Sequence, residues 1–118
     1  MTLADTSVWI DHLRHGNSLL RQLLLDGEVL SHPFVIGEIA CGFLTKRAEI
    51  LSLLATLPTV VIADHFEVLR LLDTERLYGR GLGWIDMHLL ASAVLGRAPL
   101  WTLDRTLARV ASAMGVAA

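Results

Sequence analysis

Short apolar runs alternate with segments of helical periodicity along the chain. The apolar runs predict strands at residues 2–5, 28–31, 59–63 and 99–103, with a further edge strand at 116–118. Apolar residues recur at helical spacing between these runs. They predict helices at residues 6–14, 17–25, 33–44, 47–57, 64–78, 84–95 and 104–114. This alternation predicts one α/β domain, residues 1–118, with a parallel sheet covered on both faces.

Two acidic residues follow predicted strands. Asp5 stands at the end of the first strand, and Asp104 comes directly after the strand at 99–103. In a parallel α/β sheet the functional crevice lies at the carboxyl ends of the strands. We therefore expect both side chains at the same edge of the sheet.

Two more acidic residues lie on helix faces where an apolar residue is expected. Glu38 has Val35, Cys41 and Gly42 as its neighbours three and four positions away, and Asp86 heads the apolar stripe of its helix. No arginine or lysine lies three or four positions from either acid. Because a buried carboxylate needs compensation, a cation, backbone donors or a metal should be close by.

Convergence of these four acids is the simplest explanation. Clustered carboxylates repel one another unless they share a cation. Hard oxygen ligands of this kind suit Mg²⁺ or Mn²⁺, which can activate a water for phosphodiester hydrolysis. The pattern predicts such a site at Asp5, Glu38, Asp86 and Asp104.

Each acid also has a purely structural explanation. Asp5 and Asp104 could cap helices. Asp86 lies near a helix N-terminus, where the helix macrodipole favours an acidic side chain. Glu38 lies too far inside its helix to cap it, but it could pair with a remote arginine. These roles are compatible with metal binding, because a cap position also points into the crevice.

Composition narrows the class of protein. Hydrophobic residues make up 53% of the chain, and the mean hydropathy is high. The longest unbroken apolar run nevertheless has about four residues, whereas a membrane-spanning helix needs roughly 20. The apolar surplus predicts a large core and a subunit or partner interface. The N-terminus lacks the pattern of a signal peptide, and a single cysteine excludes an internal disulfide, so we expect a cytoplasmic protein.

The formal net charge is −2, which argues against a strongly basic nucleic-acid binder. It does not exclude a nuclease, because bound metal ions would reverse the field of an acidic site.

Aromatic and histidine residues are further candidates for the site. The three tryptophans could stack on bases, but each lies in an apolar element, which favours core packing; they are Trp9, Trp84 and Trp101. His88 lies two residues from Asp86 and should point away from its face, which favours a scaffold role.

Four segments carry a family resemblance. They are LADTSVWID at 3–11, PFVIGEIACG at 33–42, GLGWIDMHLLASA at 81–93 and LWTLDRTLARVA at 100–111. In this order and spacing they resemble the PIN-domain ribonucleases, and within them the VapC-type toxins of bacterial toxin–antitoxin systems. The resemblance implies a three-layer α/β/α sandwich with a twisted parallel sheet of four to five strands.

The resemblance also implies roles for single residues. Asp5, Glu38 and Asp86 correspond to the core metal ligands, and Asp104 to a fourth acid that acts directly or through water. A further acid and a phenylalanine that many relatives carry after the fourth acid are absent here, which leaves the number of metals open.

Two hydroxyl residues match positions that orient acids in the family. Thr6 is expected to orient the first acid and Thr102 the fourth. Arg80, in the glycine-rich loop at 79–83, is a candidate for RNA contact.

The resemblance implies a metal-dependent endoribonuclease acting on structured tRNA or ribosomal RNA. It implies a VapB-type antitoxin whose C-terminal segment covers the acidic groove, and a homodimer formed through the leucine-rich stretches 19–25 and 50–57. Two alternatives remain: a catalytically inactive PIN-fold binding module, and a phosphoacceptor receiver domain. The receiver needs a lysine at the end of a late strand, whereas Lys46 lies between the predicted helices at 33–44 and 47–57.

Overall fold

A parallel sheet of three short strands lies at the centre of the computed structural model, which describes all of residues 1–118. The strands are β1 (Thr2–Ala4), β2 (Val29–Leu30) and β3 (Leu100–Trp101), in the order β2-β1-β3. Leu3 of β1 lies opposite Leu30 on one side and Leu100 on the other. The first strand is therefore the central one, as expected for the most buried apolar run.

The two remaining predicted strands are reduced to single bridges. Thr59 pairs only with Ser31, and Ala117 only with Leu100, so the sheet has three strands instead of the expected four to five. Beyond Thr59 the backbone leaves the sheet. The backbone N–H of Ala63 then donates to the hydroxyl of Ser92 at 3.1 Å. Pairing ends after Thr59 because β2 stops at Leu30 and the chain enters α3 at Pro33, so the β-branched run has no strand left to pair with.

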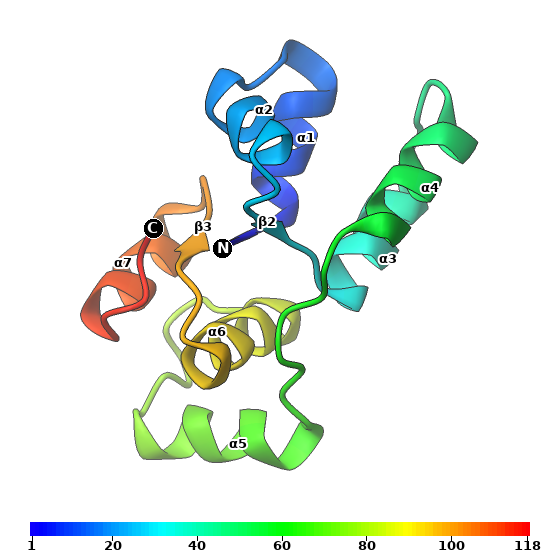
Figure 1. The fold of residues 1–118 in the computed structure, drawn as a ribbon. Helices are drawn as coiled ribbons and strands as arrows, with labels where there is room; N and C mark the ends of the chain where they lie inside the picture. Colours follow the sequence, from blue (N-terminus) through cyan, green and yellow to red (C-terminus); the bar gives the residue numbers. More distant parts are fainter.

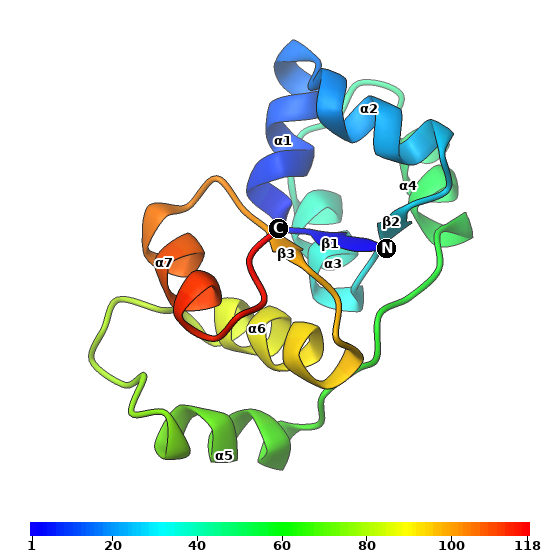
Figure 2. The same cartoon turned by 60° about the vertical axis from the view of Figure 1, so that its left-hand side comes forward.

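Seven helices surround this sheet (Figures 1 and 2). They are α1 (Thr6–His15), α2 (Ser18–Leu25), α3 (Pro33–Cys41), α4 (Arg47–Thr56), α5 (His65–Thr74), α6 (Trp84–Gly96) and α7 (Arg105–Ala113). Helices α1 and α2 lie on one side of the sheet, and α6 and α7 lie on the other, with α5 outside α6 (Figure 2). Helix α3 packs against α1, and α4 against α3. The layered α/β class is as expected.

Helix α6 is the centre of the core on its side of the sheet. Every residue from Met87 to Ala93 is buried. A helix that is buried all round must be covered on both sides, and here the sheet and α5 provide that cover (Figure 2). Near its end the helix packs closely on Val60 and Val61, where a Cβ added at Gly96 would lie 3.4 Å from both side chains.

Two apolar residues lie outside the core that their periodicity predicted. Phe43 was expected to extend the apolar face of α3, but that helix ends at Cys41 and the Phe43 side chain is fully exposed. Trp84 was expected in the core and is 39% exposed at the start of α6, whereas Trp9 is 1% exposed. Periodicity cannot distinguish a buried helix end from an open one.

The order of connections makes the carboxyl end of β1 a topological switch point. The chain leaves β1 through α1 and α2 to reach β2 on one side, and later returns through α5 and α6 to reach β3 on the other. Open α/β sheets bind ligands at such a point, outside the carboxyl ends of the strands. We call this place, where the four acids are expected, the crevice. None of the helices combines the length and apolar character that crossing a bilayer requires.

Candidate active site

Asp5 occupies the end of β1 and begins α1. Its Oδ1 accepts the backbone N–H of Thr6 at 2.7 Å. Its Oδ2 accepts the hydroxyls of Thr102 at 2.7 Å and of Ser7 at 2.9 Å. The residue is only 6% exposed, so these three donors compensate the burial of its charge.

The same hydroxyls tie the ends of β1 and β3 together. The Thr102 Oγ1 accepts the backbone N–H of Asp104 at 3.0 Å, and the Ser7 Oγ accepts the backbone N–H of Leu103 at 3.0 Å. Asp104 then begins α7, where its Oδ1 accepts the N–H of Leu107 at 2.9 Å. One network therefore fixes the first and the fourth acid relative to each other.

This network departs in detail from the expected roles of the hydroxyls. Thr102 was expected to orient the fourth acid through its side chain, but its hydroxyl donates to Asp5 and only accepts from the Asp104 backbone. Thr6 approaches Asp5 through its backbone, and its hydroxyl donates to Glu38 instead. Ser7 was not anticipated at all. A hydroxyl two residues after Asp5, at the start of a helix, was the signal that could have identified it.

Glu38 reaches the site from α3. Its Oε1 accepts the Thr6 hydroxyl at 2.6 Å, across the contact between α1 and α3. The side chain is exposed, although its small and apolar neighbours along the helix had suggested burial. The open position arises because this part of α3 faces the crevice instead of another element.

Asp86 lies in the first turn of α6, half-buried. Its Oδ2 accepts the backbone N–H of Gly83 at 2.9 Å. Burial raises the pKa of the Asp86 carboxyl above its ordinary value, the Gly83 hydrogen bond opposes this rise, and the charges of Asp5 and Asp104 add to it. The three aspartates are therefore close enough to repel one another.

No protein cation offsets this repulsion. The only ion pair in the chain joins the Met1 amino group to Glu28 at 3.0 Å. No group of three or more histidine, cysteine or acidic side chains adopts a geometry that could enclose a metal ion. The crevice thus gathers unpaired acids in an open arrangement without a closed ligand cage.

Each of three acids keeps one oxygen free. In Glu38, Asp86 and Asp104, one carboxylate oxygen accepts a hydrogen bond and the other has no hydrogen-bond partner within the chain. The bonded oxygen fixes the orientation of the group, and the free oxygen stays available to a ligand. Hard anionic oxygens of this kind fit a divalent cation.

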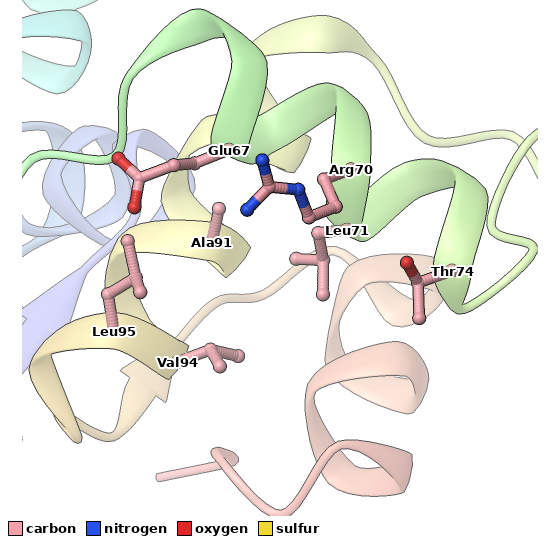
Figure 3. A pocket seen from close by; sticks show the side chains of 7 residues that line it. All are labelled: Glu67, Arg70, Leu71, Thr74, Ala91, Val94 and Leu95. Carbon is pink, nitrogen blue, oxygen red and sulfur yellow. The ribbon is translucent and has the colours of Figure 1, made fainter.

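Arg80 lies in the loop that leads to Asp86, and a separate pocket lies between α5 and α6. Arg80 is exposed in the loop between α5 and α6 and makes no hydrogen bond or ion pair. A pocket of about 250 Å³ opens between α5 and α6, lined by Arg70, Leu71, Leu95 and their neighbours (Figure 3). None of the four acids lines it, so the crevice and this pocket are different sites.

Comparison with known proteins agrees with this geometry. Residues 2–113 match the model of the PIN domain. The chain belongs to the PIN domain family. This PIN domain is 48% identical to Ribonuclease VapC32 of Mycobacterium tuberculosis, in both strain CDC 1551 / Oshkosh and strain ATCC 25618 / H37Rv. Each alignment covers 99% of this chain and 95% of the relative.

The kinship expected from the four sequence segments is therefore confirmed, including the similarity to a VapC-type protein. In this PIN domain, the segments that carried the resemblance supply the four acids of the crevice.

Proposed function

We propose that this PIN domain is an endoribonuclease toxin of a VapC-type toxin–antitoxin system, and that it hydrolyses phosphodiester bonds in structured tRNA or ribosomal RNA. The observation that carries the proposal is the crevice with its repelling, cation-free aspartates, each fixed by hydrogen bonds at the ends of β1, β3 and the start of α6. The similarity to a protein named a ribonuclease supports the same conclusion.

Mg²⁺ or Mn²⁺ is the proposed cofactor. Asp5, Glu38 and Asp86 would hold it, and Asp104 would do so directly or through water. When bound, such a metal supplies an activated water and offsets negative charge on the phosphodiester. The donor chemistry supports this assignment, because carboxylate oxygens without cation partners are the ligands such ions prefer.

The residues of the chain prepare the site before any ligand binds. Thr102 and Ser7 hold the Asp5 carboxylate against rotation, and Thr6 holds Glu38. Gly83 holds Asp86 in the same way, so the free oxygens need little reorganisation when charge arrives. The hydroxyls of Thr6, Ser7 and Thr102 already donate to Glu38 and Asp5, which favours direct attack by water over a covalent intermediate.

The inactive binding module is the second candidate. It would keep the fold and lose one or more acids or their supports. All four acids are present here, and each accepts a hydrogen bond that orients it. The receiver-domain alternative conflicts with membership in the PIN family.

The proposed partners are RNA, a VapB-type antitoxin and a second copy of this chain, in the cytoplasm. Exposed leucines on α2 and α4 support a protein interface there: Leu19 is 68%, Leu25 73% and Leu53 51% exposed. They lie within the stretches 19–25 and 50–57 that were expected to form a homodimer.

The test is cleavage of total tRNA and ribosomal RNA by the purified chain with Mg²⁺, with Mn²⁺ and with chelator. We expect discrete fragments, lost with chelator and reduced by about a hundredfold or more in Asp86→Asn. Asp73→Asn, an exposed acid of α5, is the matched control and should cleave normally. Cleavage that persists in chelator or in Asp86→Asn would refute the metal-dependent acidic site.

A further inference from the structure

A continuous series of aromatic rings joins three helices next to the acids. The His88 ring contacts Phe34 at 4.6 Å and Trp84 at 4.7 Å between centroids, both nearly edge to face. The series continues from Phe34 to His32 at 5.3 Å and from Trp84 to His65 at 5.2 Å. These rings come from the N-terminal ends of α3, α6 and α5. We name Phe34, His88 and Trp84 the aromatic bridge.

The aromatic bridge has a buried base and an open face. His88 is 7% exposed, whereas Phe34 is 38% and Trp84 39% exposed. The neighbouring His32 is buried and accepts the Phe34 N–H on Nδ1 at 3.0 Å, and burial lowers its pKa to about 4. The wall behind the two open rings is therefore packed, and its His32 ring is neutral at pH 7.

The aromatic bridge shares a helix face with one of the acids. Phe34 and Glu38 are four residues apart on α3, so they share a face about 6 Å apart along the axis. On α6, Trp84 and His88 each lie two positions from Asp86, so they leave the helix on a different face from that acid. The bridge thus spans the two helices that bring Glu38 and Asp86 to the crevice.

We infer that the aromatic bridge binds an unpaired RNA base by stacking on Trp84 and Phe34, next to the phosphodiester held at the acids. This inference rests on the proposed ribonuclease function. Aromatic faces accept every base, because each base presents a π-face. RNA loops splay their bases out onto such rings.

A protein partner is a weaker explanation for this surface. The open residues of the bridge are planar rings, and the leucines suited to helix packing are exposed elsewhere, on α2 and α4. An RNA phosphodiester bound at the free oxygens of the acids would also place the neighbouring bases of that RNA near the aromatic bridge. No additional partner is needed to explain why the rings are exposed there.

The test measures binding in an Asp86→Asn background with Mg²⁺, where cleavage is suppressed. The first probe is a fluorescein-labelled single-stranded RNA of mixed sequence, about 12 nucleotides long, which is enough to cover one small site. The second probe is an abasic strand of the same length. Fluorescence anisotropy gives the affinity, and a salt titration gives the slope of log affinity against log salt. Thermal unfolding checks that each variant is folded.

We expect Trp84→Leu to weaken RNA binding by about tenfold, and Trp84→Phe to retain most of the affinity. The salt slope should stay unchanged, because stacking releases no counterions. Binding of the abasic strand should be the same in all variants. Phe34→Leu should behave like Trp84→Leu, and it serves as the second variant if Trp84→Leu unfolds. Phe43→Leu, an exposed phenylalanine outside the bridge, is the matched control.

RNA affinity within twofold of the background protein in both leucine variants would overturn the inference, as would an equal loss on the abasic strand. Failure of the proposed function has a different signature. The unmutated chain would then cleave no RNA, whatever the effect of Trp84→Leu on binding.

Discussion

At the scale of single residues, the acids of the crevice have two tasks each. In Glu38, Asp86 and Asp104 one oxygen is held by a donor of the chain and the other is left without a partner. The structural explanation and the catalytic one therefore do not compete. A carboxylate that caps a helix or binds a hydroxyl is also an oriented carboxylate, and orientation is what a ligand site requires.

Asp86→Asn should stabilise the metal-free protein at pH 7. Burial and the neighbouring aspartates raise the pKa of Asp86 in the folded state, so folding is disfavoured once the group ionises. This penalty is absent below the ordinary value of 3.8 and is complete above the raised pKa. The Asn variant should therefore melt higher than the unmutated chain at pH 7 in chelator, and the gap should close as the pH falls toward 3.8.

Thermal unfolding monitored by circular dichroism measures this gap, with Asp73→Asn as the control. A lower melting temperature for Asp86→Asn at pH 7 would mean that the Gly83 hydrogen bond outweighs the repulsion. Added Mg²⁺ should reverse the order, because it would bind the unmutated site better and stabilise that chain by mass action.

At the scale of elements, the site is built from the junctions between strands and helices. Asp5 ends β1 and caps α1, and Asp104 follows β3 and caps α7. A parallel strand that runs directly into a helix needs an acceptor for the first free N–H groups, and aspartate supplies it. The same junctions lie at the carboxyl edge of the sheet, so the capping residues converge there.

Substitutions at Asp104 should separate capping from catalysis. Asp104→Ala removes the acceptor for the Leu107 N–H and should lower the free energy of unfolding by about 1 kcal/mol. Asp104→Asn should keep that stability, since asparagine caps as well as aspartate. Both variants should lose RNA cleavage. Urea unfolding measures the change in stability, and the cleavage assay measures the change in activity. Full activity in Asp104→Asn would mean that Asp104 only caps α7.

At the scale of the whole molecule, the connections decide where function can reside. Because the chain goes to one side of β1 first and to the other side later, the four acids come from the starts of α1 and α7 and from α3 and α6. The exposed leucines of α2 and α4 belong to other helices. This separation leaves room for a protein interface that does not use the acids.

Leu19→Glu should convert the proposed homodimer to a monomer. Leu19 is 68% exposed on α2, and a charge buried in an apolar interface without a partner is costly. Light scattering after size-exclusion chromatography measures the mass of the unmutated chain and the variant. Leu95→Glu, an exposed leucine of α6, is the control and should leave the mass unchanged. An unmutated chain that is already monomeric would refute the homodimer.

Much of this protein could be predicted from local sequence. All seven helices were predicted, although α3 ends at Cys41 instead of residue 44 and α5 ends at Thr74 instead of residue 78, and the first strand and its acid lie as expected. Helix periodicity and capping depend on residues a few positions apart, so one chain segment carries the whole signal. The four acids could be found in the same way, because each stood out against its own neighbours.

The tertiary structure alone decided the rest, because it depends on contacts between distant segments. The loss of pairing after Thr59 follows from the end of the neighbouring strand β2 at Leu30, and the role of Ser7 follows from a contact with the far end of the chain. The exposure of Glu38 and Trp84 depends on which elements cover them, and periodicity does not contain that information. The sequence by itself determined which acids stand out as candidates for the site. Only the fold decided which of them touch and which face solvent, because burial and hydrogen bonding are properties of the assembled elements.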